Sequence, residues 1–121
     1  MFAVKGDKAQ QLLTVAFSQT VTAEEAKACL NEVQNVLEDM NAGFRLLTDL
    51  TGLISMEAAS SDFIKRSMDL IGAKGVSMVA RVIPDPHKDI GFNLMSRFHY
   101  SRSVRIVTCE SLEDARKQLE G

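Results

Sequence analysis

The chain has 121 residues, of which 45% are hydrophobic and 25% charged, and its net charge is −2. This length fits a single domain over residues 1–121. The near balance of charge argues against nucleic acid as the main partner, because binding phosphates needs a clustered positive surface. No stretch approaches the roughly 18 consecutive apolar residues of a membrane-spanning helix. Lys5, Asp7 and Lys8 interrupt any signal peptide, so we expect a cytoplasmic protein.

Cys29 and Cys109 are the two cysteines. Each lies in an apolar run, which predicts a buried small hydrophobic side chain. A disulfide framework would need more cysteines, in a secreted chain.

The first quarter of the chain predicts a hairpin followed by a helix. Residues 2–5 and 12–17 are short apolar segments separated by the turn residues Gly6 and Asp7, which indicates an antiparallel pair of strands. Thr22 and Glu25 form a capping-box pattern that starts a helix. Apolar residues at helical spacing follow, and Gly43 ends the helix.

The rest of the chain alternates strands and helices. We expect strands at residues 44–50, 76–83 and 104–107. A helix is expected over residues 56–71, with Ser55 as N-cap and Glu57 in its first turn, where a carboxylate is favourable. Asp85 and Pro86 predict the start of a short helix, and Ser111 caps the last one.

The expected order is therefore ββαβαβαβα, an α/β fold with a mixed five-stranded sheet. Strands that alternate with helices form parallel units with right-handed crossovers, and the opening hairpin makes the sheet mixed. Partners and ligands of such sheets meet the loops beyond the carboxyl ends of the strands. Here those loops are residues 51–57, 84–88 and 109–111.

This element order, with the heptapeptide Leu-Leu-Thr-Asp-Leu-Thr-Gly at residues 46–52, resembles the STAS domain and its SpoIIAA-like relatives, the anti-sigma-factor antagonists. The likeness covers nearly the whole chain in element order, and its residues are specific around 49–60. It implies a domain that regulates by binding other proteins. The SpoIIAA-like branch also resembles the lipid-carrying Sec14 fold, which implies ligand binding as an alternative.

Regulatory members of that family carry Asp-Ser-Ser-Gly at the start of the following helix, and the first Ser accepts phosphate from a partner kinase. In this chain the tetrad falls on Glu-Ala-Ala-Ser at residues 57–60. The family's phosphoacceptor position is thus Ala58, which has no hydroxyl. We expect the usual phosphorylation switch to be absent, although Ser55, Ser60 and Ser61 lie nearby.

The segment 92–100 is rich in aromatic residues, Met and Arg, a mixture that interfaces favour. Ile90, Leu94 and Phe98 repeat every four residues and predict the buried face of a helix. Phe92 and Met95, together with Tyr100, fall off that face. They predict either an exposed apolar patch or a lid over a pocket.

The chain contains no catalytic constellation. His87 and His99 lack the spacing of metal ligands, and there is neither a Gly-x-Ser-x-Gly elbow nor a phosphate-binding glycine loop. We therefore expect a non-enzymatic regulatory protein–protein interaction module without metal or cofactor. Its expected partner-binding residues come from two segments: Thr51, Ser55, Glu57, Ser60, Phe92, Met95 and Tyr100. The alternative is a small carrier of an apolar or lipid-like ligand, and a homodimer stays open.

Overall fold

The computed structural model describes residues 1–83, 100 and 104–120. Their five strands form one sheet in the order β1-β2-β3-β4-β5. β1 (Phe2–Asp7) is antiparallel to β2 (Leu12–Val21). β3 (Arg45–Met56), β4 (Met78–Val82) and β5 (Arg105–Cys109) run parallel to β2. The α/β fold with a mixed five-stranded sheet is confirmed.

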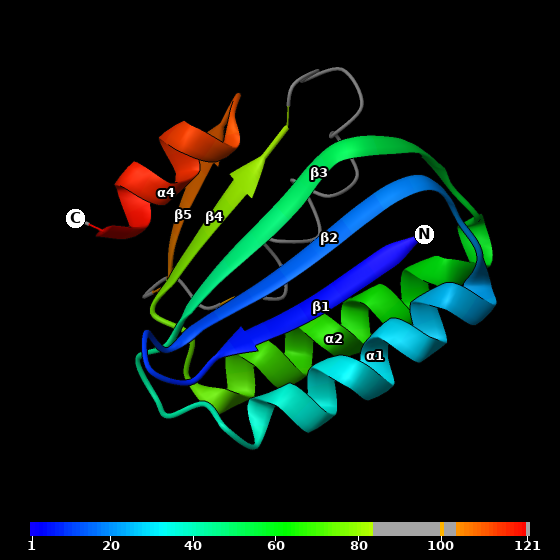
Figure 1. Ribbon diagram of the computed structural model, residues 1–121. Helices are drawn as coiled ribbons and strands as arrows, with labels where there is room; N and C mark the ends of the chain where they lie inside the picture. The colour runs from blue at the N-terminus through cyan, green and yellow to red at the C-terminus, as the bar shows by residue number, and fades with distance from the viewer. Residues whose placement is uncertain (84–99, 101–103, 121) are drawn as a thin grey trace.

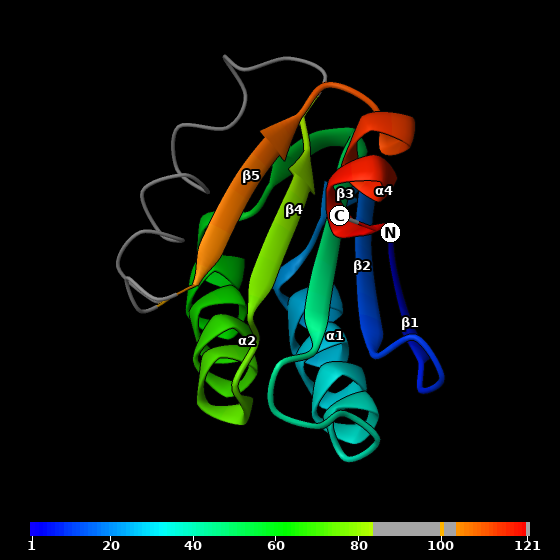
Figure 2. The same ribbon diagram turned by 90° about the vertical axis from the view of Figure 1, so that its left-hand side faces the viewer.

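Helices cover both faces of the sheet (Figures 1 and 2). α1 (Ala23–Leu37) and α2 (Ser61–Lys74) lie side by side on one face, and α4 (Leu112–Glu120) lies on the other. Two apolar clusters follow from this arrangement, a large one under α1 and α2 and a smaller one under α4. The helix expected from residue 85 lies outside the described residues. None of the described helices has the length and hydrophobicity to cross a membrane.

The capping box at the start of α1 is present as the sequence predicts. The backbone N–H of Glu25 donates to Thr22 Oγ1 over 3.1 Å, and the N–H of Thr22 donates to Glu25 Oε1 over 3.4 Å. The helix buries Ala26, Cys29, Val33 and Leu37 toward the sheet. Cys29 and Cys109 are both buried and free, as expected.

The boundary between β3 and α2 differs from the expectation. β3 does not end at residue 50 but continues to Met56, because β2 also runs on to Val21 and supplies its backbone partners. A 3₁₀ turn, η1 (Ala58–Ser60), follows, and α2 begins only at Ser61. Ser55 therefore lies inside a strand and caps no helix.

Two register shifts interrupt the pairing of β2 with β3. Ala16 pairs with Asp49 but Ser18 pairs with Gly52, so β3 carries one extra residue there. A Cβ on Gly52 would lie 2.9 Å from the Cβ of Ser18, closer than real side chains approach. Gly52 thus permits the close approach of two strands at a bulge and lies inside β3, not in the loop expected at residues 51–57.

Candidate interaction site at the end of the third strand

The last residues of β3 form a distinct part of the sheet. The pairing of β3 with β4 ends at Asp49 and Val82, whereas the pairing with β2 continues to Met56. Figure 1 shows this end of β3 curving toward the start of α1. The residues expected to form a loop after the strand, 51–57, are therefore mostly part of an extended and bulged strand.

Asp49 stabilises the first bulge. Its Oδ1 accepts a hydrogen bond from the backbone N–H of Thr51 over 3.0 Å, and the Thr51 hydroxyl donates to the same oxygen. Short polar side chains satisfy local backbone groups in this way where a ladder is interrupted. The conformation of the strand end is thus fixed by its own sequence as well as by β2.

Glu57 and Ser55 join the end of β3 to neighbouring elements. Glu57 Oε1 accepts from the backbone N–H of Ala23 over 2.8 Å, at the first residue of α1, and the Glu57 N–H donates to Val21 O over 2.9 Å. The Oγ of Ser55 lies 3.0 Å from Thr20 Oγ1. The expectation that Glu57 supports its own helix is therefore corrected: its carboxylate caps α1, which lies 34 residues earlier.

Ile54 is an exposed apolar residue at the end of β3 that is not among the residues expected to bind a partner. Its side chain is 64% exposed, and it falls at the second register shift, where Gln19 pairs with Leu53 and Thr20 with Ser55. Thr51, Ser55, Glu57 and Ala58 around it are exposed as well. A signal existed in the sequence, since a β-branched apolar residue stood in a segment expected to be a solvent-exposed loop.

The serine residues of the tetrad region differ in accessibility. Ala58, at the family's phosphoacceptor position, is exposed on the first residue of η1. Ser60 is fully buried and its hydroxyl donates to Glu57 O, so it is not at the surface where we expected a partner contact. The Ser61 hydroxyl donates to Ala58 O over 2.9 Å. Ser60 packs here because the late start of α2 turns it toward the interior.

Tyr100 does not belong to an exposed patch. Its side chain is only 6% exposed and packs with the apolar cluster under α1 and α2. Burial raises the pKa of its hydroxyl above the usual 10.0. Phe92 and Met95, the other members of the aromatic segment, lie outside the described residues.

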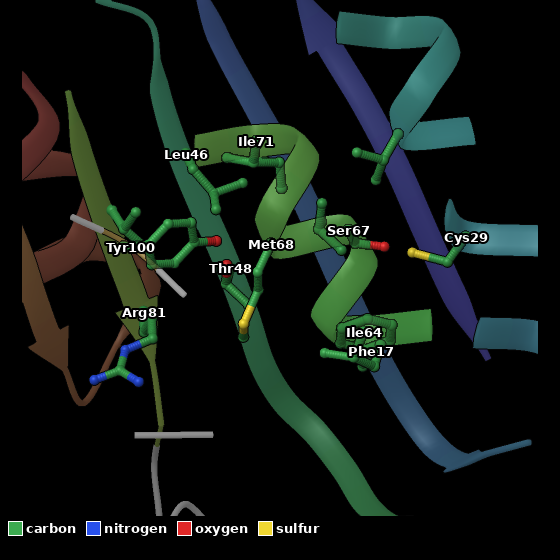
Figure 3. Close-up of a pocket in the computed structure, with 13 residues that line it drawn as sticks. Phe17, Cys29, Leu46, Thr48, Ile64, Ser67, Met68, Ile71, Arg81 and Tyr100 are labelled. Atoms are coloured by element: carbon green, nitrogen blue, oxygen red, sulfur yellow. The ribbon is translucent and has the colours of Figure 1, made fainter. Parts of the chain in front are cut away.

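Tyr100 lines a cavity between the sheet and the two helices α1 and α2 (Figure 3). The sulfur of Cys29 and the hydroxyl of Ser67 point toward one another across it, while the guanidinium of Arg81 points away. Burial raises the pKa of Cys29 from 9.0 to about 12, so its thiol stays protonated near neutral pH. The cavity volume is about 40 Å³. That is room for a few water molecules, and it falls well short of the roughly 300 Å³ at the lower end of ligand pockets.

Comparison with solved structures identifies the class of fold. No protein-family model matches the sequence, and no curated protein matches it either. A protein of the DUF3478 family from Shewanella loihica PV-4, described as having a SpoIIAA-like fold, aligns with a TM-score of 0.77 at 16% identity, over 98% of this chain and 93% of its own. The chain therefore has the SpoIIAA-like fold, as the resemblance implies.

Two further structures with this fold have regulatory descriptions. An anti-sigma factor antagonist from Mycobacterium paratuberculosis aligns with a TM-score of 0.63 at 13% identity, over 100% of this chain and 96% of its own. The Bacillus cell fate determinant SpoIIAA, in its phosphorylated form, aligns with a TM-score of 0.66 at 9% identity, over 98% of this chain and 99% of its own. At these identities the likeness establishes the fold of this chain and leaves its activity to be argued from the site.

Proposed function

We propose that this protein is a non-enzymatic regulatory module that docks a protein partner through the end of β3 and the η1 turn. The observation that carries the proposal is Ile54, a large apolar side chain 64% exposed on a backbone held by hydrogen bonds to β2 and α1. Apolar anchors on a preorganised surface are typical of the residues that dominate binding energy at interfaces. The regulatory descriptions of structures with the same fold support this reading.

The surroundings of Ile54 suggest the chemistry of the partner. Glu57 and Glu24 are exposed beside each other, because the Glu57 carboxylate is bound at the first residue of α1. An apolar anchor with an acidic rim fits a partner that offers an apolar pocket bordered by Lys or Arg. Such a rim speeds association and improves selectivity more than it adds affinity, so binding is expected to weaken as salt rises.

The anchor is tested by placing a charge on it. Ile54→Asp should leave the unfolding midpoint nearly unchanged, since the side chain is exposed, but should weaken partner binding about tenfold or more, as loss of a central apolar contact does. Gln34→Asp, on the exposed side of α1, adds the same charge elsewhere and serves as the matched control. Affinity capture from the source cell with the three proteins measures the effect. Equal capture by the unaltered chain, Ile54→Asp and Gln34→Asp would show that Ile54 is not part of the binding surface.

We also propose that this protein lacks the serine phosphorylation switch of the family that it resembles. Ala58 cannot accept phosphate, and phosphate on Ser60 would require a fully buried hydroxyl to leave its bond to Glu57 O. After incubation with serine kinases of the source cell, intact-mass spectrometry should therefore show no stoichiometric phosphate. An Ala58→Ser variant restores the hydroxyl on an exposed residue and is the matched control for kinase recognition. Stoichiometric phosphate on Ser55, Ser60 or Ser61 of the unaltered protein would contradict the proposal.

A further inference from the structure

The outer edge of β1 carries backbone groups that β2 does not satisfy. Met1 and Ser18 exchange two hydrogen bonds, from the Met1 amino group to Ser18 O over 2.7 Å and from the Ser18 N–H to Met1 O over 2.8 Å. Along an antiparallel ladder, residue pairs that exchange two hydrogen bonds alternate with pairs that exchange none, and the β1–β2 register has no shift. Because Met1 and Ser18 are a hydrogen-bonded pair, Phe2, Val4 and Gly6 belong to the pairs that exchange none. The N–H and C=O groups of Phe2, Val4 and Gly6 therefore point away from β2. Within the described part of the chain no other strand pairs with this edge, which Figure 2 shows at the end of the sheet opposite β5.

The side chains of β1 divide cleanly between the two faces of the sheet. Phe2 and Val4 pack against the cluster under α1, and a Cβ on Gly6 would lie 2.5 Å from Val36 Cγ1 of that helix. Lys5 and Asp7 lie on the opposite face, where they line a groove together with Leu12 and Leu47. β1 contains no proline and no bulge, so it lacks two of the devices that keep edge strands from pairing.

We infer that this edge binds a second copy of the same chain, with β1 paired antiparallel to β1 of the partner subunit about a two-fold axis at Val4. In that register each of Phe2, Val4 and Gly6 donates and accepts one hydrogen bond across the axis. Phe2 lies opposite Gly6 of the partner subunit, so the largest side chain on this face of β1 meets the position that has none. The result is one continuous sheet through both subunits.

The occupant is a second copy because the edge is complementary to itself. The three residues whose backbone groups point away from β2 have a large side chain (Phe2), a medium one (Val4) and none (Gly6). Only an antiparallel copy centred on Val4 places Phe2 of each subunit opposite Gly6 of the other. Charge favours the same register. It places Lys5 opposite Ala3 of the partner subunit, whereas a shift by two residues would place Lys5 opposite Lys5 of the partner subunit, and like charges directly opposite are destabilising. This inference is independent of the docking role of Ile54.

A proline at residue 4 tests the pairing. Val4→Pro removes an N–H that points away from β2, and proline is tolerated on the solvent side of an edge strand, so the hairpin should persist. Val4→Ala removes most of the same side chain but keeps the N–H, and is the matched control. By sedimentation equilibrium the unaltered chain and Val4→Ala should become dimeric as concentration rises, while Val4→Pro should stay monomeric. A dimer of undiminished strength in Val4→Pro, or a monomeric unaltered chain at every concentration, would overturn the inference.

Amide hydrogen exchange tests the same pairing without any substitution. The N–H groups of Ala3, Lys5 and Asp7 bond to β2 and should be protected at low and high protein concentration alike. Those of Val4 and Gly6 should exchange rapidly in dilute solution and become protected as the dimer forms. Rapid exchange of Val4 and Gly6 in samples that are dimeric would place the contact elsewhere and contradict the inference.

Discussion

Replacing Tyr100 by Ala should lower the free energy of unfolding by about 3–5 kcal/mol, the range found when a buried aromatic side chain is truncated. The ring is 6% exposed and packs in the cluster that holds α1 and α2 to the sheet. Its removal enlarges the cavity that the ring lines, and the surrounding side chains can close the added space only in part. Equilibrium unfolding in urea, followed by circular dichroism, measures the loss.

Tyr100→Phe is the matched control for this prediction. It keeps the ring and removes only the hydroxyl, so it should cost about 1 kcal/mol or less. Ile54→Ala removes a large apolar side chain from an exposed site and should be nearly neutral. A loss below about 1 kcal/mol in Tyr100→Ala would mean that the ring is not part of the core.

Stability should fall steeply at alkaline pH because Cys29 is buried as a neutral thiol. Burial raises its pKa from 9.0 to about 12, so between these values the unfolded chain releases a proton that the folded chain keeps. The folded state then binds more protons, and the free energy of unfolding decreases as pH rises; below pH 9.0 the full stability is present. Each unit of pH within this window removes about 1.4 kcal/mol, and Tyr100, whose pKa is also raised by burial, adds a loss in the same direction at higher pH.

A Cys29→Ala variant isolates the contribution of the thiol. The packing lost with the sulfur is the same at every pH. The variant lacks the ionising thiol, however, so between about pH 8 and pH 10.5 it should lose about 2 kcal/mol less stability than the unaltered chain. Urea unfolding of both proteins at these two pH values gives the difference, and groups that titrate in both chains cancel. Parallel losses in the two proteins would show that the Cys29 thiol already ionises in the folded state.

Much of the fold follows from short-range patterns in the sequence. Thr22 and Glu25 specify the start of α1 by themselves, because the capping box joins residues three apart. The order of the described strands and helices, the opening hairpin and the burial of both cysteines follow from hydrophobic periodicity and turn residues. The identity of Ala58 at the phosphoacceptor position is likewise a property of the sequence alone.

The candidate site was only partly predictable. Thr51, Ser55 and Glu57 were identified from their place after the motif at residues 46–52, and the structure brings them together on the surface at the end of β3. Ser60 was expected at the partner-binding surface, and Tyr100 in an exposed apolar patch or a lid over a pocket; both are buried, and Tyr100 lines a small cavity. Periodicity assigns a face to residues inside a helix, but Ser60 lies at a turn and Tyr100 is the last residue of the aromatic segment, so no helical period assigns either of them a face.

The tertiary structure decided where β3 ends, and with it the surface that carries Ile54. The sequence predicts a loop over residues 51–56, yet they form a strand because β2 continues beside them to Val21 and supplies hydrogen-bond partners. The same pairing places Glu57 within 2.8 Å of the Ala23 N–H, a bond between residues that are distant in sequence. Sequence by itself determined which elements form, because local backbone preferences and side-chain periodicity are short-ranged. Their lengths at the site, and which side chains remain exposed there, depend on backbone hydrogen bonds between segments that only the folded chain brings together.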